Sequence, residues 1–575
     1  MNLTLAYLGR SGLAPTASGQ LLSLAPNLKR EAVSFDAPLL RPVRFREAIS
    51  ALHDVVISDL RYHPRDKTAY EEWKKNEQRR IAALRSASYK QAKEEILARR
   101  EEPVPPDLER QYARCRKIYW GARQEYANYL LKHDRELWRM LMPCDPVITV
   151  AEDVVFFECF SADESSYGCL IVNCAECFGK SDITKLGTTN VDYSWDLFHH
   201  FQSLRTYRET RFRVDPAGFE VATQGSEDYR EEKIDLPAGW LRGFMQIQSA
   251  MTLPMRKVTL SREAVYSILA WLRRHKARKS PRALRFEMVS GKPPTLVLEP
   301  WEQRIIVRGD PCRNSTGEPI RIWGKQRLLA LARLLPLAQN FDVYLLGTGL
   351  PSFWVANMGE MQLTLGLSGW TANDWTHGSA LDLLAPPSKP SPELIANVAR
   401  YLQQARAAAF ADIDARCSSD PGLTAAALPG LTAAALKHLA HSGQVIFDLP
   451  HGLYRWRQIM PQVLGEAEIG PDNPEQTASL QLVARGKVKL ESQHDAPNGG
   501  KIYIGKVDGK PVELLVDADG RIRRGKCVCS HHYKAGIRMG PCRHLLALRR
   551  LATSRGELES SAAAWYQRLQ SWARN

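Results

Sequence analysis

The sequence predicts a multidomain α+β protein, and three observations support this fold class. At 575 residues the chain exceeds the roughly 250–300 residues at which a single hydrophobic core stops growing. Highly charged sequence typical of helices gives way near Val147 to short apolar runs typical of strands. Two stretches with the composition of linkers, Ala385–Pro392 and Gly465–Pro474, then set off two smaller modules.

The composition argues against a membrane protein and against a secreted, disulfide-rich protein. Hydrophobic residues make up 44% and charged residues 25%, which is ordinary for a soluble globular protein. No run approaches the roughly 18 apolar residues of a membrane helix, and the N-terminus lacks the pattern of a signal peptide. We therefore expect a cytoplasmic protein without a membrane partner. Its eleven dispersed cysteines do not form a disulfide framework.

Residues 1–145 are predicted to form a helical, charged N-terminal region. Tyr70–Arg100 is rich in good helix formers with opposite charges at helical spacings. Three prolines end that helix before a second helical stretch, Asp107–Met142. The pair indicates an antiparallel helical hairpin, and its charges are more typical of a solvated face than of a binding site.

Residues 146–384 are predicted to form a mixed α/β central domain. Ser261–Lys279 has an apolar stripe at helical spacing and Ser261 as its N-cap. A second helix is expected at Gln326–Leu337. The expected strands are Val147–Val150, Asp153–Phe160, Cys169–Asn173, Thr295–Leu298, Arg304–Val307 and Phe341–Leu346.

Two features of this central domain admit a functional and a structural interpretation. Cys159, Cys169, Cys174 and Cys177 could bind a second metal, but two of them fall in apolar strands, where free cysteine behaves as a small hydrophobe. The loop Gly366–His377 contains Trp370, Asn373, Asp374, Trp375 and His377. It could be a recognition site, or its tryptophans could anchor it to the core. We favour the structural interpretation of both features.

Residues 391–464 are predicted to form a winged-helix-like domain. A helix at Glu393–Ala409 and one ending at His441 precede a β-hairpin, Gln444–Leu449 with Leu453–Ile459. This order resembles a winged helix-turn-helix, whose last helix can enter the DNA major groove. That helix is poor in cations here, so Arg455 and Arg457 on the wing are better placed for DNA, while protein contacts are an equal alternative.

Residues 476–552 are predicted to form a small β-β-α module, followed by an amphipathic tail at 553–575. Strands are expected near Leu480–Leu490, Lys501–Val507 and Val512–Val516, with tight turns at two Asp-Gly pairs. Cys527 and Cys529 then form a C-x-C pair, and Cys542 with His544 forms a C-x-H pair at the start of an apolar helical run. Three thiolates and one imidazole are the ligands of a closed, structural Zn²⁺ site.

These residues resemble the SWIM-type zinc finger, whose pattern is C-x-C, a spacer and C-x-H. The resemblance covers roughly Val512 to Arg550 and implies that Cys542 and His544 are ligands rather than the nearby His531 and His532. SWIM fingers occur in DNA-binding and in protein-interaction settings. Bacterial multidomain SWIM proteins are similar in layout, and some belong with MoxR-type AAA+ ATPases and von Willebrand A-domain proteins, so the resemblance implies either kind of partner.

A basic surface favours DNA or RNA as the partner of this module. From Lys501 to Arg550 there are twelve Lys and Arg against four Asp and Glu, within a chain of formal charge +15. Such clustering can supply salt-sensitive phosphate binding, although cations can also balance a thiolate centre. The candidate contacts are Arg521, Arg523, Arg524, Lys526, Lys534, Arg538 and Arg543.

No catalytic residue is assigned. The chain lacks H-E-x-x-H, G-x-S-x-G and G-x-G-x-x-G in the required contexts. The sequence therefore favours a zinc-binding, nucleic-acid-binding protein without enzymatic activity. A protein-interaction adaptor is the alternative, and an enzyme in the central domain stays open.

Overall fold

We describe the protein from a computed structural model, which divides the chain into two compact units. One comprises Met1–Ser58 with Pro143–Asn575, and the other is Asp59–Met142. In the second unit only Arg114 is described, so the predicted helical hairpin lies outside the described residues. The described residues are 3–8, 11–16, 19–58, 114, 145–181, 183–215, 230–236, 238–277, 282–307, 319–369, 375, 390–418, 430–460, 474–496, 500–516, 522–538 and 540–554.

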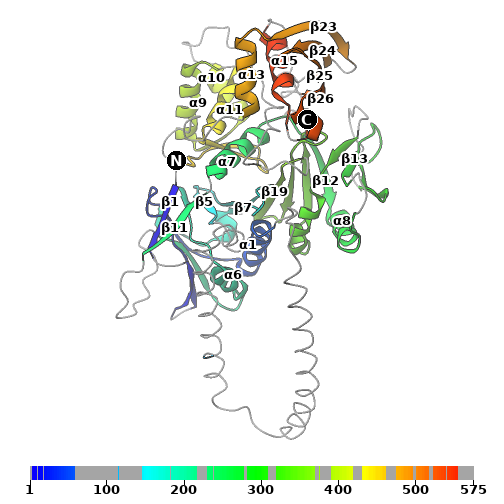
Figure 1. Cartoon of the computed structure of the whole chain (residues 1–575). Helices are drawn as coiled ribbons and strands as arrows, with labels where there is room; N and C mark the ends of the chain where they lie inside the picture. The colour runs from blue at the N-terminus through cyan, green and yellow to red at the C-terminus, as the bar shows by residue number, and fades with distance from the viewer. Residues whose placement is uncertain are drawn as a thin grey trace. The chain divides into compact units, whose positions relative to one another are not determined.

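An eight-stranded antiparallel sheet lies at the centre of the first unit, in the order β12-β17-β18-β19-β7-β6-β5-β9 (Figure 1). Its central strands β6, β7, β18 and β19 are buried along almost their whole lengths, which is typical of strands covered on both faces. The six strands expected in residues 146–384 are confirmed to within three residues at each end, and the sheet contains further strands that the sequence did not predict. The bounds are β5 Val147–Val150, β6 Val154–Phe160, β7 Ser166–Asn173, β9 Gly187–Asn190, β12 Arg256–Ser261, β17 Asn340–Leu345, β18 Ser352–Asn357 and β19 Met361–Leu367.

Alternate residues of β6 contribute to two different cores. Val155 and Phe157 pack on one face with helix α1 (Pro42–Val56). Val154 and Phe156 pack on the other with helix α7 (Ala238–Met251). Because each buried aromatic or aliphatic side chain contributes about 1.5–3 kcal/mol, both faces of this sheet are essential to the fold.

The N-terminal segment differs from the prediction. The described residues between Leu3 and Pro38 include four strands, so the expected helical region is wrong for this stretch. Strand β3 pairs in parallel with β10, and β1 pairs with β11. The five-stranded sheet has the order β2-β3-β10-β4-β8. The bounds are β1 Leu3–Leu8, β2 Gly12–Pro15, β3 Gln20–Leu24, β4 Ser34–Pro38, β8 Ile183–Lys185, β10 Thr210–Val214 and β11 Arg230–Leu236, with helices α5 Cys174–Cys177 and α6 Trp195–Gln202.

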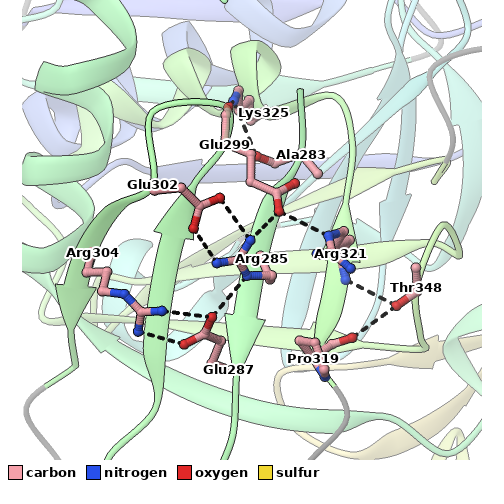
Figure 2. Close-up of polar contacts among 10 residues, drawn as sticks. All are labelled: Ala283, Arg285, Glu287, Glu299, Glu302, Arg304, Pro319, Arg321, Lys325 and Thr348. Carbon is pink, nitrogen blue, oxygen red and sulfur yellow. Dashed lines mark hydrogen bonds and ion pairs between the residues drawn. The ribbon is translucent and has the colours of Figure 1, made fainter. Parts of the chain in front are cut away.

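A smaller sheet, ordered β15-β14-β13-β16, contains the charge network of Figure 2. Arg285 donates to the carboxylates of Glu287, Glu299 and Glu302, and Glu299 is 1% exposed. Lys325 donates to the carbonyl of Ala283 at 3.3 Å, and burial lowers its pKa to about 8. Arg285 thus pairs with three carboxylates, whereas Lys325 is bonded to backbone carbonyls and Oε2 of Glu299 has no hydrogen-bond partner among the described residues.

The bounds in this region are β13 Leu284–Glu287, β14 Thr295–Leu298, β15 Gln303–Ile306 and β16 Ile320–Ile322. Helix α8, Arg262–Arg274, confirms the predicted amphipathic helix, and the hydroxyl of Ser261 caps it by accepting from Ala264 N at 3.3 Å. The helix expected at Gln326–Leu337 is a 3₁₀ helix, η1 Lys325–Leu334.

Residues 390–418 and 430–460, which we call the 390–460 module, share a core of their own. A three-stranded sheet, ordered β20-β22-β21, packs with three helices around Val398, Leu402 and Leu436. The predicted hairpin is confirmed, and a short strand ends the region expected as one long helix. The bounds are α9 Pro392–Ala405, β20 Ala407–Ala409, α10 Phe410–Ser418, α11 Gly430–His441, β21 Val445–Asp448 and β22 Leu453–Trp456.

The C-terminal module consists of a four-stranded antiparallel sheet with α13 and α15 (Figure 1). The strand expected near Leu480–Leu490 is wrong for residues 480–484, which belong to helix α13. A strand, β23, begins only at Val488. The turn at Asp508–Gly509 is confirmed, with positive φ at both residues. The bounds are α13 Pro474–Ala484, β23 Val488–Ala496, β24 Gly500–Val507, β25 Lys510–Val516, β26 Ile522–Cys527, α14 Ser530–Ala535 and α15 Arg543–Ser554.

The described helices are all too short or too polar to span a membrane.

Candidate metal centre

Four side chains of the C-terminal module converge as the sequence predicts. Cys527 ends β26, Cys529 is the N-cap of α14, and Cys542 and His544 lie at the start of α15. Their ligand atoms all lie within 4.8 Å of one another. Cys542 is fully buried, and His544 is 5% exposed. The group could hold one metal ion.

The chemistry of the four donors fits a soft or borderline divalent cation. Burial raises the pKa of the Cys542 thiol, and the neighbouring Cys527 and Cys529 raise it further because thiolates so close repel one another. A bound cation reverses that penalty. The buried Nδ1 of His544 has no hydrogen-bond partner among the described residues, which leaves a ring nitrogen available as a ligand.

Backbone N–H groups already point at the sulfur atoms. His532 N donates to Cys529 Sγ at 3.4 Å. Burial raises the pKa of both the Cys527 and the Cys542 thiol, and the N–H groups of Cys529 and Leu545, which face these two thiols respectively, partly offset that rise. Such donors stabilise thiolates, which are the form that binds metal.

Close packing brings the two ligand pairs together. Gly525 of β26 lies under α15, and a Cβ there would be 2.6 Å from Leu545 Cδ2. Glu475 of α13 accepts from Arg543 N at 2.6 Å, which satisfies a free N–H at the start of α15. Glu475 lies 68 residues before Arg543, so sequence spacing gives no signal for this cap.

An ion bound by all four residues would have no open position for water, which is typical of a structural site. His531 and His532 do not belong to the group. Nδ1 of His531 instead lies 4.0 Å from a carboxylate oxygen of Glu475.

The cysteines of the central domain form no candidate metal group among the described residues. Cys159 and Cys177 belong to the core that contains α1, whereas Cys169 belongs to the core on the other face of the sheet. A sheet therefore separates them, and their burial agrees with the hydrophobic interpretation.

The six described cations of the predicted nucleic-acid surface are all exposed, and Arg521 lies outside the described residues. Lys526 pairs with Glu513 at 2.8 Å, and Arg543 pairs with Glu475. Arg523 lies against the loop at Gly347, whose Cβ would be 3.1 Å from the Arg523 Nη1. The six are Arg523, Arg524, Lys526, Lys534, Arg538 and Arg543.

The wing arginines are not available to DNA, which corrects the prediction. Arg455 pairs with Asp448 at 2.8 Å and with Asp153 at 2.7 Å. Arg457 pairs with Glu158, and both of these side chains are at most 2% exposed. Buried charges must be paired. Asp448 belongs to β21 of the same module, whereas Asp153 precedes β6 and Glu158 lies on β6 of the central sheet.

Trp375 of the Gly366–His377 loop is 1% exposed and stacks on Phe353 at 6.1 Å between ring centroids. This contact agrees with the anchoring interpretation for that tryptophan. Trp370, Asn373, Asp374 and His377 lie outside the described residues.

No family model and no curated protein matches the chain. Among solved structures, proliferating cellular nuclear antigen from Entamoeba histolytica is similar at 12% identity, with 39% of this chain and 89% of that chain covered and a TM-score of 0.27. A PCNA2–PCNA3 complex from Sulfolobus tokodaii is similar at 8% identity, with 41% and 93% covered and a TM-score of 0.27. TM-scores this low do not establish a shared fold.

Proposed function

We propose that the chain is a zinc-binding protein of the SWIM type whose C-terminal module binds nucleic acid. The metal is assigned as Zn²⁺ because three cysteines and one histidine are a usual ligand set of structural zinc sites. Such a set fills all four tetrahedral positions and leaves none open for water. The convergence of Cys527, Cys529, Cys542 and His544 supports this assignment.

One observation carries the nucleic-acid proposal: every described cation of the predicted surface is solvent-exposed. These cations lie on the elements around the metal group, namely β26, α14, the turn after α14 and the start of α15. Exposed ion pairs such as Lys526–Glu513 contribute only about 0–1 kcal/mol, so phosphate can replace the carboxylate at little cost. Arg524 and Lys534 are the best candidates for direct phosphate contacts, since no carboxylate partner of either is found in the described part of the chain.

We further propose that residues 390–460 are a winged-helix domain used for protein contacts. The order α9-β20-α10-α11-β21-β22, with β22 in the middle of the sheet, supports this fold. The buried pairs of Arg455 and Arg457 support a role in attaching the module to the central sheet rather than to DNA.

A salt titration of the full-length chain tests the nucleic-acid proposal. Binding to a labelled oligonucleotide should weaken steeply between about 50 and 200 mM salt. The double variant Arg524→Gln/Lys534→Gln should reduce the slope by about two, because each lost phosphate contact removes about one. Arg273→Gln, an exposed cation on α8, is the matched control and should leave the slope unchanged. Absence of binding at low salt would leave the protein-interaction adaptor as the better function.

A further inference from the structure

The turn that carries the metal ligands also exposes two large apolar side chains. Tyr533 on α14 is 90% exposed, and Val528 between the two cysteines is 66% exposed. Exposed apolar residues are unremarkable when they are scattered singly, but here two lie on one short turn. Tyr533 N donates to Cys529 O at 2.9 Å, so the backbone of Tyr533 is bonded to the residue that follows Val528.

Exposed cations surround this pair on both sides in the sequence. Arg524 and Lys526 precede it on β26, where they lie opposite Leu515 and Glu513 of β25. Gly525 between them faces α15, so strand alternation directs Arg524 and Lys526 to the open face of the sheet. Lys534 follows Tyr533 directly and is exposed as well.

We propose that this surface binds an unpaired nucleic-acid strand, with Tyr533 as a platform on which a base stacks and Arg524, Lys526 and Lys534 as phosphate contacts. This inference rests on the proposed nucleic-acid function and names the form of the ligand. A basic groove with exposed aromatic side chains is the usual arrangement in proteins that bind single strands. In a duplex the base faces are stacked on each other, so a duplex would leave the ring of Tyr533 without a partner.

The exposed cations favour a nucleic-acid strand over an apolar protein as the ligand of this surface. An apolar partner would have to desolvate Arg524 and Lys534, for which the described residues supply no carboxylate. Unpaired buried cations are costly, whereas a strand brings a phosphate with each base. Tyrosine has few rotatable bonds, and the backbone N–H of Tyr533 is bonded to the carbonyl of Cys529, so little side-chain freedom is lost when a base stacks.

The test compares a labelled strand of about 20 nucleotides, as DNA and as RNA, with the duplex of the same sequence, using the full-length chain at about 50 mM salt. The wild-type chain should bind a single strand more tightly than the duplex. Tyr533→Ala should weaken single-strand binding about 5- to 100-fold, the range for loss of one stacked base. Tyr533→Phe keeps the ring and should retain the wild-type affinity.

Two exposed tyrosines elsewhere are matched controls. Tyr207 is 77% exposed and Tyr266 is 61% exposed, and both lie outside the C-terminal module. Tyr207→Ala and Tyr266→Ala should bind like wild type. Equal metal content of Tyr533→Ala and wild type verifies that the module is intact.

The experiment distinguishes a failure of the single-strand inference from a failure of the proposed nucleic-acid function. If the chain binds nucleic acid but prefers the duplex, or if Tyr533→Ala binds the strand like wild type, the single-strand inference is wrong and the proposed function stands. If the chain binds neither probe, the proposed function is overturned together with the inference.

Discussion

Arg457 and Glu158 form a buried ion pair between segments 299 residues apart in the sequence. Glu158 lies on β6 of the central sheet and also accepts from Tyr167 OH at 2.6 Å. The Arg457 guanidinium lies over the ring of Phe244 at 5.4 Å. The pair fixes the position of the 390–460 module on the central sheet, because a shift of either one would leave a buried charge without its partner.

Replacing Arg457 by Met should therefore destabilise the chain by about 3–5 kcal/mol, since Glu158 would lose its counter-charge inside the protein. Arg457→Met/Glu158→Gln should recover much of this loss. The measurement is urea unfolding followed by tryptophan fluorescence. Arg304→Gln removes a pair with Glu287 whose arginine is 56% exposed, and should cost at most about 1 kcal/mol. Equal losses for Arg457→Met and Arg304→Gln would refute the role of burial.

The metal group yields a second prediction. The purified chain should carry about one equivalent of zinc, and Cys542→Ser should lose it, because Cys542 is a buried member of the single group found in the described residues. Without the ion, α15 should detach from the sheet and expose Leu545 and Leu548, since binding energy is folding energy at such sites.

Metal analysis and limited proteolysis measure both effects. Cys174→Ser, a half-buried cysteine outside the group, is the matched control and should keep the metal. Full metal content in Cys542→Ser would point to His531 or His532 as a replacement ligand.

His53 should make the fold sensitive to acid. It is 2% exposed, its Nδ1 bonds the Tyr193 hydroxyl at 2.9 Å, and burial lowers its pKa to about 4. The folded state thus favours the neutral ring. Its contribution is complete above the unfolded pKa near 6.5 and is lost as the pH falls toward 4, which amounts to about 3 kcal/mol.

The pH dependence of unfolding in wild type and His53→Gln measures this contribution. Both proteins contain the same metal group, so the difference between their curves isolates His53. The variant should lose less stability between about pH 6.5 and 4. Parallel curves would show that another group accounts for the acid response.

The sequence predicted those features whose chemistry is local. The pairs Cys527/Cys529 and Cys542/His544 are each two residues apart, and this spacing predicts a metal group. The resemblance to the SWIM pattern then favours Cys542 and His544 over His531 and His532. Arg455 and Arg457 look available to DNA in the sequence because Asp153 and Glu158, which pair with them, lie 302 and 299 residues away, and no local pattern marks such pairs. Asp448, the other partner of Arg455, is only seven residues away on the hairpin.

The element errors have similar causes. Residues 3–38 combine Leu, Pro and Ser without clear alternation, and their strands are defined by pairing with β10 and β11, far along the chain. Leu480, Leu482 and Val483 resembled a strand, but α13 packs on α15, and the hydroxyl of Ser479 accepts from Arg550 there. In both places tertiary packing outweighs local preference.

Gly525→Ala tests the packing that unites the ligand pairs. The new Cβ would lie 2.6 Å from Leu545 Cδ2 and 2.8 Å from Cδ1, so α15 or the leucine must shift. Overpacking of this kind costs about 1–3 kcal/mol, and a shift of α15 moves Cys542 and His544 away from Cys527. We expect a lower midpoint in urea and weaker zinc retention against a competing chelator.

Lys526→Ala, the neighbouring residue on the open face, should change neither, because its 78% exposed side chain packs on nothing in the core. Unchanged zinc retention in Gly525→Ala would mean that the ion itself, rather than the Gly525–Leu545 contact, determines where α15 lies.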